Sequence, residues 1–565
     1  MEWLKNFVKQ RTTSQKIVLL VSVLLLSSAM LLLSAKQIVL AESGKQTILT
    51  TLQKIIFSNT KGKNNTNTSS VFSNTPVSFL LSKPSPSLLT PSETYGGSSS
   101  IGSTPTPMPG ASGTSNTTPT STQTGSNVLI SINPSAVGLS VPPQIDGIST
   151  ETGAICKILS QDSLSSTYSQ LYKNLGSEML RIGGNSGDQA TWSPSGTYCP
   201  TSPDAIDEQE VNNLITFVNK IGWKFTWGVD LGTYDPTDMA SEADYVYNEA
   251  GSTLYAIAIG NEPNNFANEG YRTSGYNGTS FTTEWQAYKT AILGINPSIP
   301  LMGDDQSQNV PWYSTFMSSE ASSLILSGYH LYPTASTGTG PNAPTIANLL
   351  SQSLMNNTIG TIQTWEAVAK EYNVPFALTE VNSTAGGGKS GVSNAFASAL
   401  WSADYIFTAM EQGVQRMNFH AVGGGASYEA IDSSGNVHPL YYGLLFFHEA
   451  TANGGNVIMP SIHATTNTTA HVILGGDGKL YVAVINKDLT NTATVDIRTT
   501  TNYSQASVMY MTAPSASSTS GVTFGGASTA ANGTWSPTPS SLQIINGTDT
   551  YLTLSPAEAA LVTLQ

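Results

Sequence analysis

Short apolar runs of strand length recur along residues 143–420, and turn-forming residues lie between most of them. Segments whose apolar residues have helical spacing separate several of these runs. The runs predict eight strands, at residues 143–149, 178–184, 224–231, 254–260, 299–303, 325–332, 374–380 and 414–420. Helical spacing is clearest at residues 163–176, 208–222, 283–295 and 361–373.

This order of elements predicts an α/β fold. Eight strands that alternate with helices over roughly 280 residues have the pattern and size of a (β/α)8 TIM barrel, which we place at residues 143–450. The alternative is a doubly wound open sheet, which would have a glycine-rich phosphate loop after its first strand. The sequence after residue 149 contains no such loop, so we favour the barrel.

The pattern changes after the barrel, because the remaining apolar runs are short and lack helical spacing. Residues 451–565 therefore predict a C-terminal antiparallel β-sandwich domain. Residues 127–142 also alternate like one or two strands. These strands lie outside the eight of the barrel, so we expect them to join the β-sandwich.

The N-terminal region has a different composition. In residues 1–41, basic residues precede an apolar run from Ile17 to Leu33, which fits a signal peptide or an N-terminal membrane anchor. Residues 42–126 are rich in Ser, Thr, Pro and Asn and predict a disordered linker. We therefore expect an extracellular protein, secreted or tethered to the cell membrane. A linker is most useful if its far end is held, so we favour the tether.

Composition and charge exclude some classes of protein function. The net charge of the 565 residues is −14, which excludes nucleic-acid binding by counterion release. The two cysteines, Cys156 and Cys199, form either one disulfide in an oxidising compartment or two buried thiols. The six histidines are scattered and there is no CxxC motif, so we expect no metal and no cofactor.

Two carboxylates lie at strand ends, where a barrel of this type has its active site. Glu262 follows the fourth strand in IGNEPN, and Glu380 ends the seventh strand in FALTEVN. Active sites of such barrels lie at the carboxyl ends of the strands, and strands four and seven are on opposite sides of the mouth. Two facing carboxylates can break a glycosidic bond, one as nucleophile and one as acid and base.

Neighbouring strand ends supply further candidates. Tyr332 is a hydrogen-bond donor that could keep Glu380 ionised, His330 is a second donor, and Arg181 could steady a carboxylate beneath the site. Three residues past strands one and two could contact sugar hydroxyls: Glu151, Asn185 and Asp188. Weaker candidates are Asp230, Asp304 or Asp305, Trp192 and Trp312.

The motifs GNEP and TE, together with LRIGGN at residues 180–185 and a C-terminal β-domain, resemble glycoside hydrolase family 79. This family includes β-glucuronidases and heparanase. The resemblance covers residues 127–565 and implies a retaining mechanism. In it, Glu262 is the acid and base, Glu380 is the nucleophile, and Asn261 holds the sugar 2-hydroxyl.

The same resemblance implies how a uronate would be held. Two glycine-rich loops, STAGGGKSG at 383–391 and VGGGASYEA at 422–430, follow strands seven and eight. Gly387, Gly388 and Tyr428 match the places that hold the glucuronate carboxylate in the family, and Lys389 could add charge. No long basic run is present to grip a sulfated chain, so we expect activity on neutral-rich glycans or small glucuronides.

The sequence thus leaves three functions open. The first is a retaining, exo-acting β-glucuronidase, with a glycan or glucuronide as its partner. The second is a retaining β-glucosidase or xylan-active glycosidase on the same barrel. The third is a non-catalytic surface protein that binds carbohydrate, which the presence of both glutamates disfavours.

Overall fold

Eight parallel strands close into a barrel. The computed structural model describes residues 125–156, 166–196, 205–307, 309–421 and 425–565. The strands are β3 (Asp146–Glu151), β4 (Met179–Gly183), β7 (Lys224–Val229), β8 (Leu254–Ile259), β9 (Leu301–Ser307), β10 (Leu324–Leu331), β11 (Phe376–Val381) and β12 (Arg416–Ala421). Neighbouring strands pair in chain order, and β12 pairs with β3 to close the ring. All eight predicted strands and the (β/α)8 fold are confirmed.

The two faces of each barrel strand differ in what they meet. Along β8, Ile257 and Ile259 belong to the large core under the helices, whereas Ala256 and Ala258 form a small inner cluster with residues of β9, β10 and β11. Arg181 alternates in the same way with Leu180 and Ile182 of β4, both in the outer core. Its side chain therefore starts on the interior face, beneath the mouth of the barrel.

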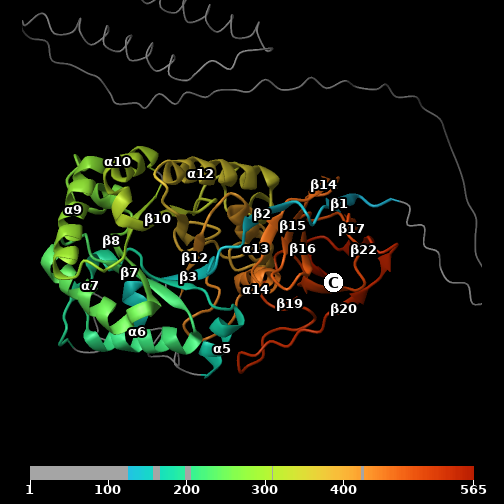
Figure 1. Ribbon diagram of the computed structural model, residues 1–565, viewed down its shortest axis with the longest axis horizontal. Helices are drawn as coiled ribbons and strands as arrows, with labels where there is room; N and C mark the ends of the chain where they lie inside the picture. The colour runs from blue at the N-terminus through green and yellow to red at the C-terminus, as the bar shows by residue number, and fades with distance from the viewer. Residues whose placement is uncertain (1–124, 157–165, 197–204, 308, 422–424) are drawn as a thin grey trace, which may run out of the picture. The chain divides into compact units, whose positions relative to one another are not determined.

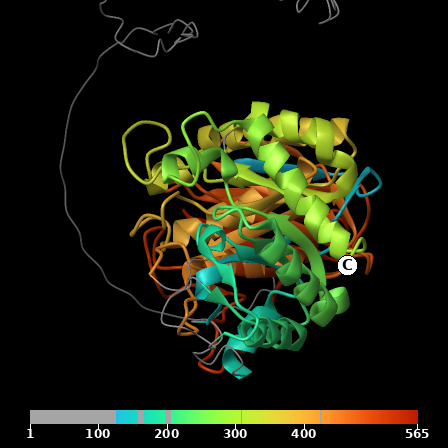
Figure 2. The same cartoon turned by 90° about the vertical axis from the view of Figure 1, so that its left-hand side faces the viewer.

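Helices surround the strands, and they lie in front in Figure 2. The main ones are α5 (Ser166–Asn174), α6 (Glu208–Ile221), α7 (Pro236–Ala250), α9 (Gly278–Ile295), α10 (Val310–Glu320), α12 (Gln352–Glu371), α13 (Phe396–Glu411) and α14 (Pro439–Thr451). The four predicted helical segments correspond to α5, α6, α9 and α12. The helical spacing of α13 is hidden, because every residue from Phe396 to Met410 is buried and no polar face interrupts the apolar one.

The C-terminal domain consists of two sheets. One has the strand order β14 (Ser461–Ala464), β1 (Val128–Ile132), β17 (Ala493–Thr499), β22 (Asp549–Leu554) and β21 (Ile544–Ile545). The other has the order β19 (Thr523–Phe524), β18 (Ala506–Thr512), β23 (Glu558–Leu564), β16 (Leu480–Asn486), β15 (Thr468–Leu474), β13 (Asn456–Ile458) and β2 (Val137–Ser140), and β20 (Ser540–Leu542) pairs with β18. Apolar residues of both sheets form one core cluster.

The N-terminal strands β1 and β2 belong to these two sheets rather than to the barrel. In Figure 1, β1 is drawn in cyan among the orange and red strands. It pairs antiparallel with β14 but parallel with β17, from Val128 opposite Val495 to Ile132 opposite Thr499. This pair departs from the purely antiparallel domain that the sequence predicted. The sequence did not indicate this parallel pair, because the two strands lie more than 360 positions apart in the chain.

A buried network of charges joins α13 to the C-terminal domain. Asp404 accepts hydrogen bonds from Lys487 Nζ at 2.6 Å, from Thr469 Oγ1 at 2.6 Å, and from His471 Nε2 at 3.0 Å. His471 Nδ1 lies 2.8 Å from Glu411 Oε1. The side chains of Asp404 and Lys487 are almost fully buried, so each charge depends on the other for compensation.

Some predictions fall on residues that the structure does not describe. The predicted signal peptide or anchor, residues 1–41, lies outside the described residues, and so does the predicted linker except for its last two positions. Within the described ranges, none of the helices has the length and apolar character needed to cross a membrane. Cys156 is disulfide-bonded, and Cys199, the other cysteine of the chain, is outside the described residues.

Candidate active site

A cavity of about 650 Å³ opens at the carboxyl ends of the barrel strands. Both predicted catalytic residues, Glu262 and Glu380, line it, together with residues of the loops that follow β9, β10, β11 and β12. A second cavity, of about 750 Å³, lies between the start of α12 and the C-terminal domain, away from both glutamates. The chemistry of the barrel therefore belongs to the first cavity.

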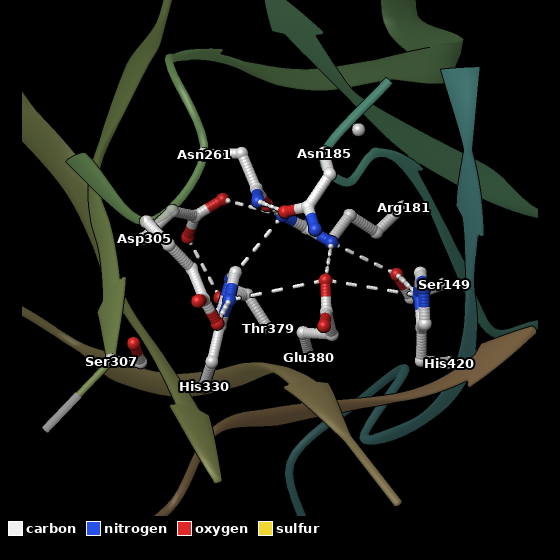
Figure 3. Close-up of polar contacts among 12 residues, drawn as sticks. Ser149, Arg181, Asn185, Asn261, Asp305, Ser307, His330, Thr379, Glu380 and His420 are labelled. Carbon is white, nitrogen blue, oxygen red and sulfur yellow. Dashed lines mark hydrogen bonds and ion pairs between the residues drawn. The ribbon is translucent and has the colours of Figure 1, made fainter. Parts of the chain in front are cut away.

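Glu380 lies at the centre of a converging set of donors (Figure 3). Arg181 Nη1 donates to its Oε2 at 2.8 Å, and Tyr332 Oη donates to its Oε1 at 2.7 Å. The contact with Tyr332 is the one predicted from the sequence. Burial alone would raise the pKa of Glu380, but the positive charges of His420, His330 and Arg181 and the hydrogen bond from Tyr332 outweigh it and hold that pKa well below the usual range. Glu380 is therefore ionised, as a nucleophile must be.

The Tyr332 contact leads to a test of this electrostatic account. Tyr332→Phe removes a donor that favours the ionised form of Glu380, so the pKa of Glu380 rises. Since the ionised form is the reactive one, the acid limb of the kcat/KM profile is expected to move to higher pH. Profiles of wild type and variant on one substrate measure this shift. An unmoved acid limb would mean that Tyr332 does not tune Glu380.

Glu262 is held in an unusual backbone conformation. Its φ and ψ are 47° and 50°, in the left-handed region, and Pro263 follows at the start of a 3-10 helix, η4 (Pro263–Asn265). Asn265 Nδ2 donates to Glu262 Oε2 at 2.7 Å, and His330 Nδ1 lies 2.9 Å from Oε1. A residue other than glycine adopts this conformation at a cost in free energy, and here the conformation aims the carboxylate across the mouth.

His330 has a different partner from the one expected. Its Nδ1 is 2.9 Å from Glu262 but 3.9 Å from Glu380, so its hydrogen bond goes to Glu262, while its charge still lowers the pKa of Glu380. Arg181 Nη2 lies 3.2 Å from His330 Nε2 and can only donate. In its neutral form His330 therefore accepts at Nε2 and donates from Nδ1 to Glu262.

The two glutamates are close together. A carboxylate oxygen of Glu262, a carboxylate oxygen of Glu380 and a ring nitrogen of His330 all lie within 4.8 Å of one another. Carboxyl groups about 5–5.5 Å apart suit attack by one of them on the sugar, whereas a gap of about 6.5–9.5 Å leaves room for a water molecule. The short separation favours direct attack.

This group is also the set of residues best placed for a metal ion within the described part of the chain. However, the two nitrogens of His330 already face Glu262 and Arg181, and the guanidinium of Arg181 balances the charge of Glu380. A cation would have to lie against that guanidinium. The contacts suit proton transfer and nucleophilic attack better than ion binding.

Arg181 organises the floor of the site. Besides Glu380, it donates to Ser149 Oγ at 3.0 Å and to Asn261 Oδ1 at 2.7 Å, and it lies 3.4 Å from Asp305 Oδ2. Asp305 in turn accepts from Thr379 Oγ1 at 2.7 Å. The role predicted for Arg181, to steady a carboxylate beneath the site, agrees with these contacts.

His420 is a site residue that the sequence analysis did not single out. It ends β12 and lines the cavity, with Nδ1 at 3.0 Å from Ser149 Oγ, Nε2 at 3.4 Å from Glu151 Oε1, and Nδ1 at 3.8 Å from Glu380 Oε2. Burial would lower the pKa of His420, but the carboxylates of Glu380 and Glu151 raise it. The rule that drew attention to Glu262 and Glu380, a polar residue at a strand end, applies equally to His420.

The residues predicted to contact sugar hydroxyls divide into two kinds. Glu151 and Asn185 line the cavity. Asn185 Oδ1 accepts from Asn261 Nδ2 at 2.8 Å, which leaves the second proton of that amide for a substrate. Burial opposes ionisation of Glu151, but His420 and Ser186 hold its pKa below the usual value.

Asp188 is not among the described residues that line this cavity. Its carboxylate is buried and accepts from the backbone N–H of Leu231 at 3.1 Å and of Asn261 at 2.9 Å. The prediction that it contacts a sugar hydroxyl does not fit this placement. Asp188 instead ties the ends of β7 and β8 together and so positions Asn261.

The glycine-rich loop after β11 reaches the cavity in part. Gly386, Gly387 and Gly388 have φ values of 67°, 85° and 84°, which glycine adopts without strain. Gly387 and Tyr428 line the cavity, and Gly388 lies behind, where an added Cβ would meet the Tyr428 ring at 3.0 Å. Gly388 is thus a residue of close packing beside the pocket rather than one of its described lining residues.

The weaker candidates lie away from the chemistry. Asp230 accepts from the Thr233 N–H at 3.1 Å in a turn, and Asp304 accepts from Gln306 beneath the site. Trp192 is buried in the outer core, and Trp312 packs on Tyr276. Neither tryptophan and neither aspartate lines the cavity among the described residues, and the same holds for Lys389.

Comparisons with known proteins concern the C-terminal domain and the overall similarity of the chain. Residues 470–561 match the model of the glycosyl hydrolase family 79 C-terminal beta domain. A β-glucuronidase of Aspergillus niger is 24% identical over 372 residues, which are 56% of this chain and 64% of that protein. The chain thus spans less than two thirds of that relative.

Solved structures show the same fold. A 4-O-α-L-rhamnosyl-β-D-glucuronidase from Fusarium oxysporum 12S, in complex with Rha-GlcA, has a TM-score of 0.66 at 22% identity, over 77% of this chain and 100% of that chain. A family 51 arabinofuranosidase from Xanthomonas axonopodis pv. citri has a TM-score of 0.60 at 15% identity, over 78% and 100% of the two chains.

A closed (β/α)8 barrel with two glutamates across its mouth has the arrangement that glycosidic bond cleavage requires. This arrangement disfavours the alternative of a non-catalytic carbohydrate-binding protein. The match of residues 470–561 assigns the C-terminal domain to glycosyl hydrolase family 79, and the β-glucuronidase relative is similar over 56% of this chain.

Proposed function

We propose that this enzyme is a retaining, exo-acting β-glucuronidase. The observation that carries the proposal is a single cavity that holds the two glutamates, with oxygens within 4.8 Å, and also Gly387 and Tyr428. The first pair supplies the chemistry of retention. The second pair supplies donors suited to a carboxylate on the sugar.

The proposed reaction has two steps. In the first, the Glu380 carboxylate attacks the anomeric carbon while Glu262 gives its proton to the glycosidic oxygen, which leaves with the electron pair of the broken bond. In the second, Glu262 takes a proton from water, which attacks the same carbon and releases Glu380. Asn261, fixed by Arg181 at 2.7 Å and Asn185 at 2.8 Å, holds the sugar 2-hydroxyl.

The uronate is held by neutral donors in this proposal. No lysine or arginine belongs to the described lining of the cavity. The N–H groups of Gly386 and Gly387, which line the cavity, donate to no described residue, and successive N–H groups in a turn can cradle an anion. The Tyr428 hydroxyl adds another donor. It lies near Tyr332, because the centroids of the two rings are 6.2 Å apart.

A retaining β-glucosidase or xylan-active enzyme is the second candidate, since it would use the same two glutamates. Barrels of similar fold act on different sugars, as the arabinofuranosidase shows. The discriminating experiment is hydrolysis of 4-nitrophenyl β-glucuronide, β-glucoside and β-xyloside by the full chain. A strong preference for the glucuronide is expected. Preference for a neutral glycoside would contradict the proposed uronate site but would remain consistent with the proposed catalytic pair.

Tyr428→Phe tests the uronate site itself. The variant keeps the ring and removes one donor, and a hydrogen bond to a charged group is worth about 1.5–3 kcal/mol. The kcat/KM for the glucuronide is therefore expected to fall by roughly tenfold to hundredfold, and that for any residual glucoside activity to change little. Equal losses of kcat/KM on both substrates would instead indicate that the substitution disturbs the positions of Tyr332 and Glu380.

Exo action and location are further parts of the proposal. Tyr428 and His420 are buried where they line the cavity, which supports a pocket closed at the end of the glycan. Exo action predicts free glucuronate from chain ends without a fall in the viscosity of a polymeric substrate. The disulfide at Cys156 supports an extracellular place, either secreted or tethered, which fractionation of the producing cells would test.

A further inference from the structure

A buried asparagine follows the proposed nucleophile by two positions. Asn382 comes directly after β11, is fully buried, and is not among the described residues that line the cavity. It therefore has no direct contact with a sugar in that cavity, and the proposed reaction gives it no task. A buried amide is stable only where its polar atoms find partners, so the contacts of Asn382 show what it holds together.

Every polar atom of the Asn382 side chain has a partner. Its Nδ2 donates to the carbonyl oxygen of His420 at 3.0 Å and to that of Tyr428 at 3.2 Å, and its Oδ1 accepts from the Ser383 N–H at 2.8 Å. Carbonyl oxygens only accept, so the nitrogen of the amide must face them. The orientation of this side chain is thereby fixed, and it joins the end of the nucleophile strand to two points of the chain that are eight positions apart.

The segment that begins at Asn382 also holds Tyr428 in other ways. The Ser427 N–H donates to the carbonyl oxygen of Gly387 at 2.7 Å. Gly388 packs against the Tyr428 ring, where an added Cβ would lie 3.0 Å from Cδ1. Tyr428 is thus held by a side chain at its carbonyl, by a backbone hydrogen bond at the preceding residue, and by close packing at its ring.

The Tyr428 ring lies beside two residues that face Glu380. Its centroid is 6.2 Å from that of the Tyr332 ring and 6.1 Å from that of the His420 imidazole. Tyr332 Oη donates to Glu380 at 2.7 Å, and His420 Nδ1 lies 3.8 Å from it. A shift of the Tyr428 backbone would therefore move the hydroxyl proposed to hold the uronate relative to the nucleophile, and hydrogen bonds weaken steeply away from good geometry.

We infer that Asn382 is a positioning residue of the uronate site, which fixes Tyr428 against the strand that carries Glu380. The carboxylate of the sugar and its anomeric carbon then meet groups whose separation is set before the substrate arrives. The inference rests on the proposed β-glucuronidase function, because Asn382 acts on a uronate only through Tyr428.

The test is a double-mutant cycle on hydrolysis of 4-nitrophenyl β-glucuronide by the full chain. Asn382→Ala is expected to lower kcat/KM about tenfold, mainly through a higher KM, because a misplaced Tyr428 weakens binding of the uronate. In the Tyr428→Phe background the same substitution is expected to lower kcat/KM less than about threefold, because the hydroxyl that Asn382 positions is already absent. Asn382→Ser keeps one donor and should give a smaller loss than Asn382→Ala.

Asn418 supplies the matched control. It is buried, and its Nδ2 also donates to two backbone carbonyls, of Met179 at 3.0 Å and of Ile148 at 3.4 Å, but these partners belong to β4 and β3. Asn418→Ala is expected to lower the unfolding temperature by a similar amount. It should change KM less than about twofold, and equally in both backgrounds. All kinetics are measured at a temperature at which every variant is folded.

The outcomes separate this inference from the proposed function. Equal losses of kcat/KM for Asn382→Ala in the wild-type and Tyr428→Phe backgrounds would overturn the positioning role and leave the β-glucuronidase in place. A loss confined to kcat would do the same, because it would place the effect at Glu380. No hydrolysis of the glucuronide by the wild type would overturn both.

Discussion

Glu380→Gln is expected to lower kcat on the glycoside substrate by at least about 10⁴-fold. The amide keeps the size of the side chain, and its single oxygen can keep one of the two contacts with Tyr332 and Arg181, which are 2.7 and 2.8 Å long. It cannot form the bond to the anomeric carbon. The loss therefore reports the nucleophile rather than a change in fold, and near-normal thermal unfolding of the variant is the matching control.

Chemical rescue assigns the roles of the two glutamates separately. In Glu380→Ala, azide can enter the space left by the carboxylate and attack the same carbon, which gives the α-glycosyl azide. In Glu262→Ala, azide attacks the covalent intermediate on Glu380 and gives the β-glycosyl azide. The opposite pair of products would show that the roles assigned to Glu262 and Glu380 are exchanged.

Asp404→Asn is expected to lower the free energy of unfolding by about 3–5 kcal/mol. The substitution leaves the ammonium of Lys487, 2.6 Å away and buried, without its counter-ion. It also weakens the contact with His471 at 3.0 Å. Denaturant unfolding of wild type and variant measures the difference.

A surface pair offers the matched control. Asp477 lies 3.2 Å from Lys479, with side chains 27% and 39% exposed, and exposed ion pairs contribute only about 0–1 kcal/mol. Asp477→Asn should therefore change stability little. If Asp404→Asn lowered the free energy of unfolding no more than Asp477→Asn does, the buried network would not hold α13 to the C-terminal domain.

The pH dependence of this network has a definite sign. Burial would raise the pKa of Asp404, but Lys487 and His471 lower it well below the usual 3.8, so its contribution is present above about pH 4 and is lost on acidification. Burial would lower the pKa of His471, but Glu411 and Asp404 raise it from 6.5 to about 9. That contribution is complete below pH 6.5 and is lost as pH rises through 9. The difference in the free energy of unfolding between wild type and Asp404→Asn should therefore be largest between about pH 4 and 6.5.

The barrel, and the position of Glu262 and Glu380 at its mouth, could be predicted because their signals are local. Strands such as β7, β8 and β11 consist mostly of apolar residues, which is typical of strands buried on both faces. Glu262 and Glu380 interrupt two such runs at the strand end. The position rule for (β/α)8 barrels then places both at one mouth, and their contacts in the structure agree with that rule.

The rest of the site depends on which way each side chain points, and strand spacing does not carry that information. Asp188 and Asn185 follow the same strand three residues apart, yet Asn185 lines the cavity and Asp188 turns beneath it to the backbone of Leu231 and Asn261. His330 and Tyr332 also lie two residues apart but serve different glutamates. A bulge between Tyr329 and His330 in the pairing of β10 with β11 breaks the regular alternation.

The measurement that most directly tests the account is proton NMR of the first sugar released from 4-nitrophenyl β-glucuronide by the full chain. Attack by Glu380 followed by water from the same face predicts β-glucuronate first, with the α anomer appearing later by mutarotation. Release of the α anomer first would show inversion and contradict the roles drawn from the short separation of Glu262 and Glu380. No release of glucuronate would contradict the proposed substrate.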